Sequence, residues 1–232
     1  MGSSLRPLTL EKLVERAAAP RLAKVVPLHA VPKPAVPSRW PSPAELVDAL
    51  LSGEPEAENV LWDRYSTSVR AVLRRALGPR VEVEDALQEV FIRFFRALPG
   101  LREPSALGSF LTGIAVRVAR GVLRKRRIKS WFRLTDDGEL PELVEQDPAA
   151  ERARRAVARL YVILDGLDDE SRLLFVLRHI EELEIAEVAA CLEISVATVK
   201  RRLARVTPVV FACARKDADL AAFMPSDNEE HA

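Results

Sequence analysis

Apolar residues recur at helical spacing through most of this chain, and no other feature of the sequence constrains its fold as strongly. Between residues 44 and 124, four successive runs place apolar side chains three or four positions apart, and a fifth begins near residue 153. That spacing lines one face of an α-helix, whereas a half-buried strand needs alternation at every second position. No sustained alternation of that kind occurs. The sequence therefore predicts an all-α fold.

Glycine and proline mark where the predicted helices begin and end. Ser42, Pro43 and Glu45 form a capping box with proline at the first helical position, which predicts that ordered structure begins here. The second run stops at the Gly–Pro pair of residues 78–79, and the third stops at the Pro–Gly pair of residues 99–100. These signals separate the helices without any need for long loops.

Two stretches lack the helical pattern. Seven prolines fall within residues 20–43, and proline excludes both helix interiors and central strands, so we expect an extended arm there. Residues 134–151 hold seven acidic side chains and no basic one, with Gly138, Pro141 and Pro148 breaking any helix. This second stretch is predicted to be a flexible acidic linker.

The chain is therefore predicted to contain two small helical domains, the second of which carries a helix-turn-helix. The predicted segments are a disordered Pro-rich tail (1–41), a helical domain (42–128), an acidic linker (129–152), a helix-turn-helix domain (153–214) and a C-terminal tail (215–232).

Composition excludes several classes of protein. Two cysteines and three histidines are too few for a disulfide scaffold or a four-ligand zinc site, and no phosphate-binding glycine loop, metalloprotease motif or nucleophile elbow occurs. We therefore predict no enzymatic activity, no cofactor and no metal. We expect no apolar run to span a bilayer, and we find no signal-peptide core. The sequence therefore predicts a soluble cytoplasmic protein without membrane insertion.

The fourth helical run carries a stripe of positive charge. Spacings of three, four and three place its arginines on one helix face, and no acidic residue occurs within residues 111–135. Like charges so close destabilise an isolated helix, and a phosphate backbone is a common source of compensation. The predicted DNA-binding residues of this helix are Arg117, Arg120, Arg124, Lys125, Arg126 and Arg127. A solvated helix face, or one paired with the acidic linker, is the alternative interpretation.

Residues 182–206 have the pattern of a helix-turn-helix. Two short apolar faces flank a turn near Ser195, with glutamates before the turn and basic residues after it. A generic helical hairpin is the alternative, but the change of charge sign favours DNA binding. The predicted DNA-binding residues are Ser195, Ala197, Thr198, Lys200, Arg201, Arg202 and Arg205.

The third helical run has an outward face that combines acidic, amide and apolar side chains. Its members are Asp85, Gln88, Glu89 and Ile92. Acidic residues on an exposed face usually serve solvation, which is the favoured interpretation of this face from its residues alone; the isoleucine among them makes a protein-binding surface the alternative.

Three segments together resemble the extracytoplasmic-function (ECF) group of bacterial sigma-70 family sigma factors. Residues 84–95 (EDALQEVFIRFF) are similar to the polymerase-binding helix, residues 110–127 to the promoter-melting region, and residues 167–203 to the C-terminal helix-turn-helix. The three occur in the order found in the family, which makes the combined resemblance specific.

The resemblance implies a role for each set of residues. Asp85, Gln88, Glu89 and Ile92 would bind core RNA polymerase on its β′ subunit, the basic stripe would engage the −10 element, and the second helix of the helix-turn-helix would read the −35 element. The β subunit, promoter DNA and an anti-sigma factor are further partners that the family implies. The chain departs from the family at four positions: mildly at Phe110, where tryptophan is usual, and further at Arg117, Gly121 and Glu193. Glutamate at residue 193, in place of the usual glycine, would cost up to about 1 kcal/mol if that residue takes a positive φ.

Two other functions are compatible with the same residues. One is a helix-turn-helix regulator that never joins polymerase, and the other is a sigma-like decoy that acts through protein contacts. The net charge of +1, from 35 basic and 34 acidic residues, does not argue against DNA binding, because the two signs are segregated along the chain.

Overall fold

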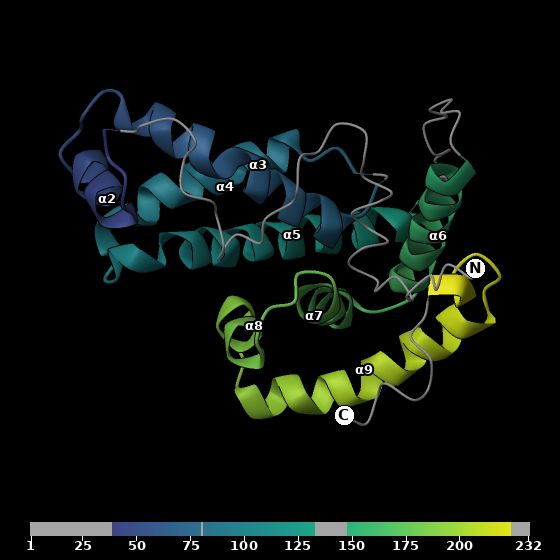
Figure 1. Ribbon diagram of the computed structural model, residues 1–232. Helices are drawn as coiled ribbons and strands as arrows, with labels where there is room; N and C mark the ends of the chain where they lie inside the picture. The colour runs from purple at the N-terminus through teal and green to yellow at the C-terminus, as the bar shows by residue number, and fades with distance from the viewer. Residues whose placement is uncertain (1–38, 80, 133–147, 224–232) are drawn as a thin grey trace, which may run out of the picture. The chain divides into compact units, whose positions relative to one another are not determined.

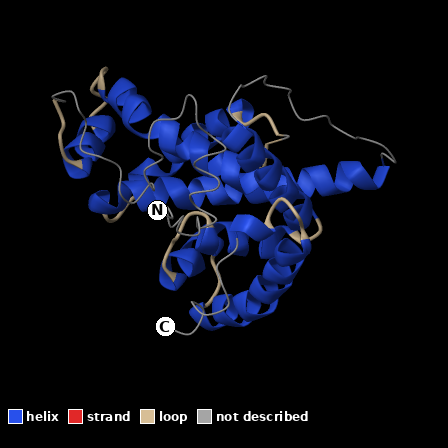
Figure 2. Ribbon diagram, turned by 45° about the vertical axis from the view of Figure 1, so that its right-hand side comes forward, coloured by secondary structure: helices blue, strands red, loops and turns tan. Residues whose placement is uncertain are grey.

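The computed structural model describes residues 39–79, 81–132 and 148–223, with side chains described as far as residue 127 in the second range. All regular elements in these ranges are helical, which confirms the predicted all-α class (Figure 2). The described residues form two compact units: one from 39–132 with Ala186–Ile194, here the N-terminal unit, and one from 148–185 with 195–223, here the C-terminal unit.

The N-terminal unit is a bundle built around helix α5 (Leu107–Phe132), which packs against α3 (Ala57–Leu77) and α4 (Glu84–Ala97) (Figure 1). The shorter α2 (Pro43–Leu51) covers one end of α3. The core consists of fully or nearly fully buried side chains from α3, α4 and α5: Leu61, Val69, Leu73, Leu87, Phe94, Leu111, Ile114 and Ala115. The unit therefore holds α5 rigidly along its first half.

The predicted signals for helix ends are confirmed. Ser42 Oγ accepts a hydrogen bond from the Glu45 backbone N–H at 3.2 Å, and the Ser42 N–H donates to the Glu45 carboxylate at 2.9 Å, completing the capping box. These bonds to Ser42 hold the pKa of Glu45 below its ordinary value. At the end of α3, Gly78 has a φ of 88°, a conformation that favours glycine.

Residues 39–41, which the sequence analysis assigned to the tail, contact the N-terminal unit. Trp40 lies within the predicted tail, yet its side chain is only 9% exposed, and Arg64 of α3 donates a 2.6 Å hydrogen bond to the Trp40 carbonyl oxygen. The Arg39 guanidinium lies 5.0 Å from the Trp40 ring centroid. Residues 39–41 are thus part of the N-terminal unit, and the rest of the predicted tail lies outside the described residues.

The C-terminal unit contains α6 (Pro148–Asp165), α7 (Asp169–His179) and α9 (Val196–Lys216), followed by the short helix η4 (Ala221–Phe223). Helix α9 packs against α6 and α7. Its second half buries Val206, Val210 and Ala214 in the same core as Leu160 and Phe175. Pro208 lies inside α9 and is exposed, so the carbonyl group that loses its backbone partner lies on the solvent side of the helix.

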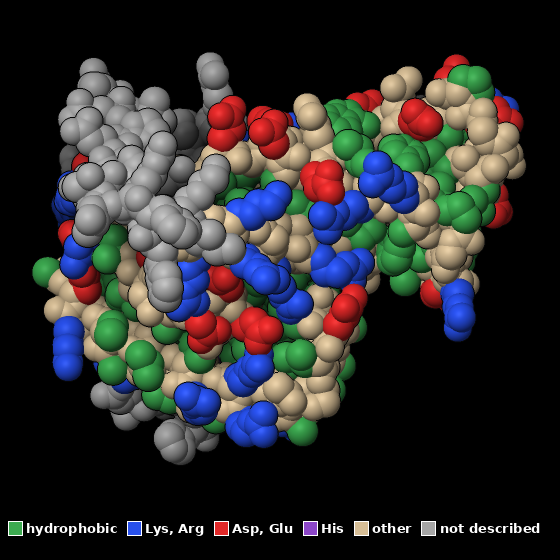
Figure 3. All heavy atoms as spheres, turned by 180° about the vertical axis from the view of Figure 1, so that it is seen from behind, with side chains coloured by type: hydrophobic (Ala, Val, Ile, Leu, Met, Phe, Trp, Pro, Cys, Tyr) green, Lys and Arg blue, Asp and Glu red, His purple; other side chains and the backbone are tan. Residues whose placement is uncertain are grey.

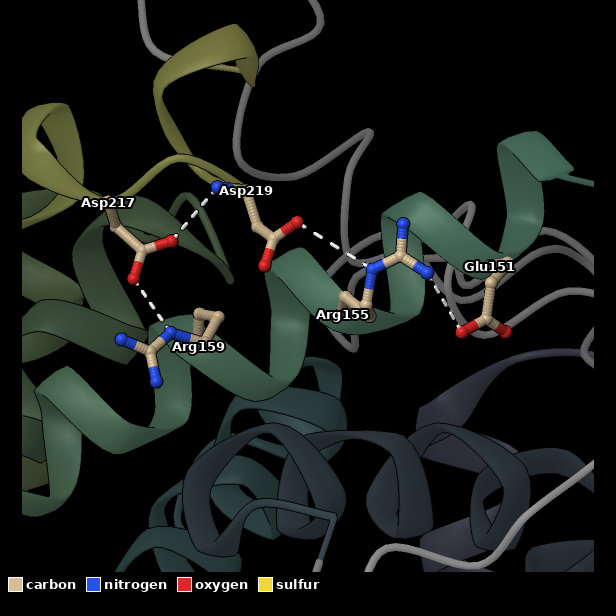
Figure 4. Close-up of polar contacts among 5 residues, drawn as sticks. All are labelled: Glu151, Arg155, Arg159, Asp217 and Asp219. Carbon is tan, nitrogen blue, oxygen red and sulfur yellow. Dashed lines mark hydrogen bonds and ion pairs between the residues drawn. The ribbon is translucent and has the colours of Figure 1, made fainter.

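Part of the predicted C-terminal tail packs against the C-terminal unit: Leu220 and Phe223 contact its apolar core. Leu220 is fully buried and contributes to the apolar cluster of the unit. Two ion pairs join this segment to α6: Arg159 to Asp217 at 2.7 Å and Arg155 to Asp219 at 3.6 Å (Figure 4). Both arginines and Asp219 are partly exposed to solvent, which weakens the ion pairs, so the fully buried leucine is the main source of stability.

The predicted linker is shorter at both ends, since α5 continues to Phe132 and α6 begins at Pro148. Most of its acidic residues lie outside the described residues. The helical segment Pro104–Arg127, with a hydropathy of 1.4, is long and apolar enough to cross a membrane by length and composition alone. The sequence analysis expected no such run. Half of its apolar 18-residue stretch is buried within the protein, and the core helix of a soluble domain can have the same length and composition, so this helix is weak evidence for a membrane span.

Candidate nucleic-acid interface

The outward face of α4 is the first candidate site. Asp85 and Gln88 are exposed, Glu89 is half-buried, and Ile92 is 45% exposed. Arg93, one turn further, donates a 2.7 Å hydrogen bond to Glu89, and this bond holds the pKa of the Glu89 carboxyl below its ordinary value. The four predicted residues therefore lie on one accessible helix face.

Two aromatic residues extend this face and were missed by the sequence analysis. Phe95 follows the fully buried Phe94 in sequence, but its own side chain is 37% exposed. Trp62 of α3 is 39% exposed, and its ring centroid lies 4.8 Å from that of Phe91. Trp62 does not share the three- and four-residue spacing of the buried apolar residues of α3. This mismatch could have indicated from the sequence that Trp62 is exposed. The α4 face is thus more apolar than predicted.

The basic stripe of α5 forms the second candidate site. Arg124, Lys125 and Arg127 are exposed, whereas Arg117, Arg120 and Arg126 are half-buried. Within the N-terminal unit, Arg117 Nη1 lies 3.0 Å from Glu193 Oε1, and Arg120 donates a 3.0 Å hydrogen bond to the Leu192 carbonyl oxygen. The C-terminal half of the stripe is therefore the more accessible part. Basic and acidic side chains lie interspersed on the face of the molecule in Figure 3.

The predicted helix-turn-helix corresponds to α8 (Ile185–Leu192), a short turn and α9. Ser195 caps α9, since its hydroxyl accepts a 3.2 Å hydrogen bond from the Thr198 backbone N–H. Glu193 in the turn has a φ of 57°, in the left-handed region that favours glycine. The turn thus takes the conformation for which the sequence analysis expected a backbone cost.

The predicted residues of α9 divide into two groups. Ala197, Lys200, Arg201 and Arg205 are exposed, and Val196 beside them is 43% exposed. Arg202 instead forms an ion pair with Glu170 of α7, and Thr198 Oγ1 lies 2.8 Å from Ser195 Oγ. Ser195, Thr198 and Arg202 therefore hold the helix in place, and the other four face solvent.

The described residues contain no group of three or more histidine, cysteine or acidic side chains able to hold a metal ion. Cys191 is buried, and burial raises the pKa of its thiol to about 11, so it is a poor nucleophile at neutral pH. His179 lies between aromatic rings in the core of the C-terminal unit. The accessible chemistry in these ranges is thus that of charged helix faces.

Taken together, an all-helical chain with a basic helix in one unit and a capped basic helix after a turn in the other defines a DNA-binding class of protein. Comparison with models of protein families agrees with this class and identifies two specific regions. Residues 61–128 match the model described as Sigma-70 region 2, and residues 158–206 match Sigma-70, region 4.

Whole-chain comparisons give the same family. The ECF RNA polymerase sigma-E factor of Escherichia coli (strain K12) is 30% identical over 176 residues, covering 71% of this chain and 90% of the relative. The factor of the same name from Haemophilus influenzae is 28% identical over 173 residues, covering 71% of this chain and 91% of the relative. The chain belongs to the ECF group of the sigma-70 family, as its sequence motifs predicted.

A solved structure has a similar fold. The structure of CnrH in complex with the cytosolic domain of CnrY matches with a TM-score of 0.52 and 23% identity, and the match covers 75% of this chain and 98% of the other. The two chains therefore share a fold, in addition to the family membership shown by the closer relatives.

Proposed function

We propose that this protein is an alternative sigma factor that binds core RNA polymerase and directs promoter recognition, DNA melting and transcription initiation. The observation that carries the proposal is the presence of both sigma-70 regions, in order, in one chain. Each region also presents an accessible charged helix. In this proposal polymerase performs the chemistry, and the protein selects where it starts.

The α4 face is proposed as the polymerase-binding surface, with the β′ subunit as its partner. It combines negative charge at Asp85 with exposed apolar area at Ile92, Phe95 and Trp62. A mixed surface of this kind suits a protein partner better than DNA, because acidic side chains repel phosphate and aromatic ones are enriched at interfaces.

The basic helices are proposed to contact the promoter at two places. Arg124, Lys125 and Arg127 of α5 would engage the −10 region, and Lys200, Arg201 and Arg205 of α9 would enter the major groove at the −35 element. Each small set of cations binds DNA weakly on its own. Linking both to one polymerase raises the effective concentration of the second contact once the first has formed.

The test is reconstituted transcription with purified core polymerase and the full chain. We expect open complexes and transcripts from a defined set of promoters. Charge reversal of Asp85 to Lys combined with Gln88→Ala should abolish polymerase binding and leave the DNA affinity of the free protein unchanged. Asp48→Lys is the matched control, because it makes the same charge change at an exposed position of α2.

The possible results separate the three functions. Specific DNA binding without polymerase binding would show a helix-turn-helix regulator that acts alone. Polymerase binding without open complexes would show a decoy. An anti-sigma factor is proposed as a regulatory partner, with support from the family and from the similar fold of CnrH, which was solved in a complex with another protein. Loss of transcription on adding such a protein, with recovery when it is removed, would establish this.

A further inference from the structure

Gly121 lies in the middle of α5, on the exposed side of the helix, and nothing in the structure requires a glycine there. Glycine in a helix interior destabilises the helix relative to alanine because it loses more backbone freedom on folding. A glycine is often kept where φ is positive, but the left-handed glycines described here are Gly53 and Gly78. The backbone conformation therefore does not account for Gly121.

Packing does not account for it either. A Cβ atom built on Gly121 would meet no heavy atom within 4 Å. The other glycine in the middle of α5 differs, because Gly113 is buried and its Cβ would lie 3.6 Å from Arg117 Nη1. An alanine at residue 121 would thus fit without any movement, and the protein carries a glycine that its own fold does not need.

The surroundings of Gly121 are cationic. Its neighbours on the helix surface are the residues three and four positions away, and three of these four are Arg117, Arg124 and Lys125. Helical side chains lean toward the N-terminus, so Arg124 and Lys125 reach back toward the turn that holds Gly121. The Arg117 guanidinium instead leans away from Gly121, toward Gly113 two turns earlier in the helix, and pairs with Glu193 at 3.0 Å. The result is a notch in the basic stripe, open to the backbone and bordered on its C-terminal side by the exposed Arg124 and Lys125.

We propose that Gly121 positions promoter DNA by letting a phosphodiester segment lie directly against α5, beside the cations of Arg124 and Lys125. Missing side chains commonly mark places where a ligand approaches a backbone closely. The positive border selects a polyanion, and α5 belongs to the matched sigma-70 region 2, so promoter DNA is the ligand. This inference rests on the proposed function and adds to it a residue that sets how closely DNA and helix approach.

The first experiment compares Gly121→Ala and Gly121→Leu with the wild type in complex with core polymerase. Gly100→Ala is the matched control, because its Cβ also enters open space and the position is remote in sequence from the stripe. We expect Gly121→Ala to raise the melting temperature of the free protein by roughly 2–4 °C. Open-complex formation, measured by permanganate reactivity of unpaired thymines, should fall several-fold in Gly121→Ala and more than tenfold in Gly121→Leu. Gly100→Ala should leave it unchanged.

The second experiment measures proximity, which a structural role would not affect. On a Cys213→Ala background, Gly121→Cys carrying a photo-crosslinker should crosslink to promoter DNA in the holoenzyme, and Gly100→Cys should not. Cys213 must be removed because it is exposed, whereas Cys191 is buried and can stay. Wild-type levels of open complex in Gly121→Leu, a matching loss of polymerase binding, or no DNA crosslink would each overturn the inference. If the wild-type holoenzyme opens no promoter, the proposed function itself fails.

Discussion

His179 makes the stability of the C-terminal unit depend on pH. Its ring lies 4.7 Å from that of Phe175 and 5.5 Å from that of Phe211, and its Nε2 lies 3.0 Å from Thr207 Oγ1. Burial, with a further contribution from the positive charge of Arg178, lowers the pKa of His179 to about 4. The folded protein therefore holds this imidazole in its neutral form.

The sign and size of the effect follow from that shift. The unfolded chain has a histidine pKa near 6.5 and binds a proton more readily than the folded protein, so the contribution of His179 is fully present above pH 6.5 and is lost as the pH falls toward 4. Each pH unit within that window costs about 1.4 kcal/mol, so lowering the pH from 8 to 5.5 should cost about 1.4 kcal/mol of unfolding free energy.

Hydrogen exchange read by mass spectrometry measures this directly. Peptides from α7 and α9 should lose protection at pH 5.5 relative to pH 8, after correction for intrinsic exchange rates, and peptides from α3 serve as an internal reference. His179→Asn keeps a polar partner for Thr207 but does not titrate, so its α7 and α9 peptides should show about 1.4 kcal/mol less pH dependence. An equal pH dependence in wild type and variant would refute the assignment to His179.

Three further predictions test the described packing and charge. Ser195→Ala removes the cap of α9 and should cost about 1 kcal/mol of unfolding free energy in urea denaturation, while Ser195→Asp should restore it. Leu220→Ala should cost about 2–5 kcal/mol in the same assay, because a fully buried leucine leaves a cavity; a change below 0.5 kcal/mol would show that residues 217–223 do not belong to the core. Arg124→Ala and Lys125→Ala should each lower the slope of log DNA affinity against log salt by about 1 in a titration at several salt concentrations, and an unchanged slope would exclude their contact with phosphate.

Local signals in the sequence were sufficient for the helix ends and for the three candidate faces. The capping box at Ser42 and the glycine at residue 78 depend only on residues close by in sequence, so the sequence pattern is sufficient to predict these helix ends. The cost predicted for Glu193 depended on a positive φ at one backbone position, and the φ of 57° meets that condition. The basic stripe follows from helical spacing alone.

Tertiary packing decided which of those residues are accessible. Phe95 and Phe94 are adjacent in an apolar run, but only Phe94 is covered by neighbouring helices. Arg202 carries the same charge as its neighbour Arg201. Arg202 forms an ion pair with Glu170, which lies 32 residues earlier in the sequence, whereas Arg201 is exposed.

The same reason explains why the ends of both units were misplaced. Trp40 and Leu220 lie in stretches without helical periodicity, and both are buried by side chains distant in sequence. The sequence by itself determined that this is an all-helical, two-region sigma factor with its charges on separate helices. Only the tertiary structure decided which side chains of the proposed polymerase-binding and DNA-binding faces remain exposed, because burial depends on contacts that periodicity within one helix does not contain.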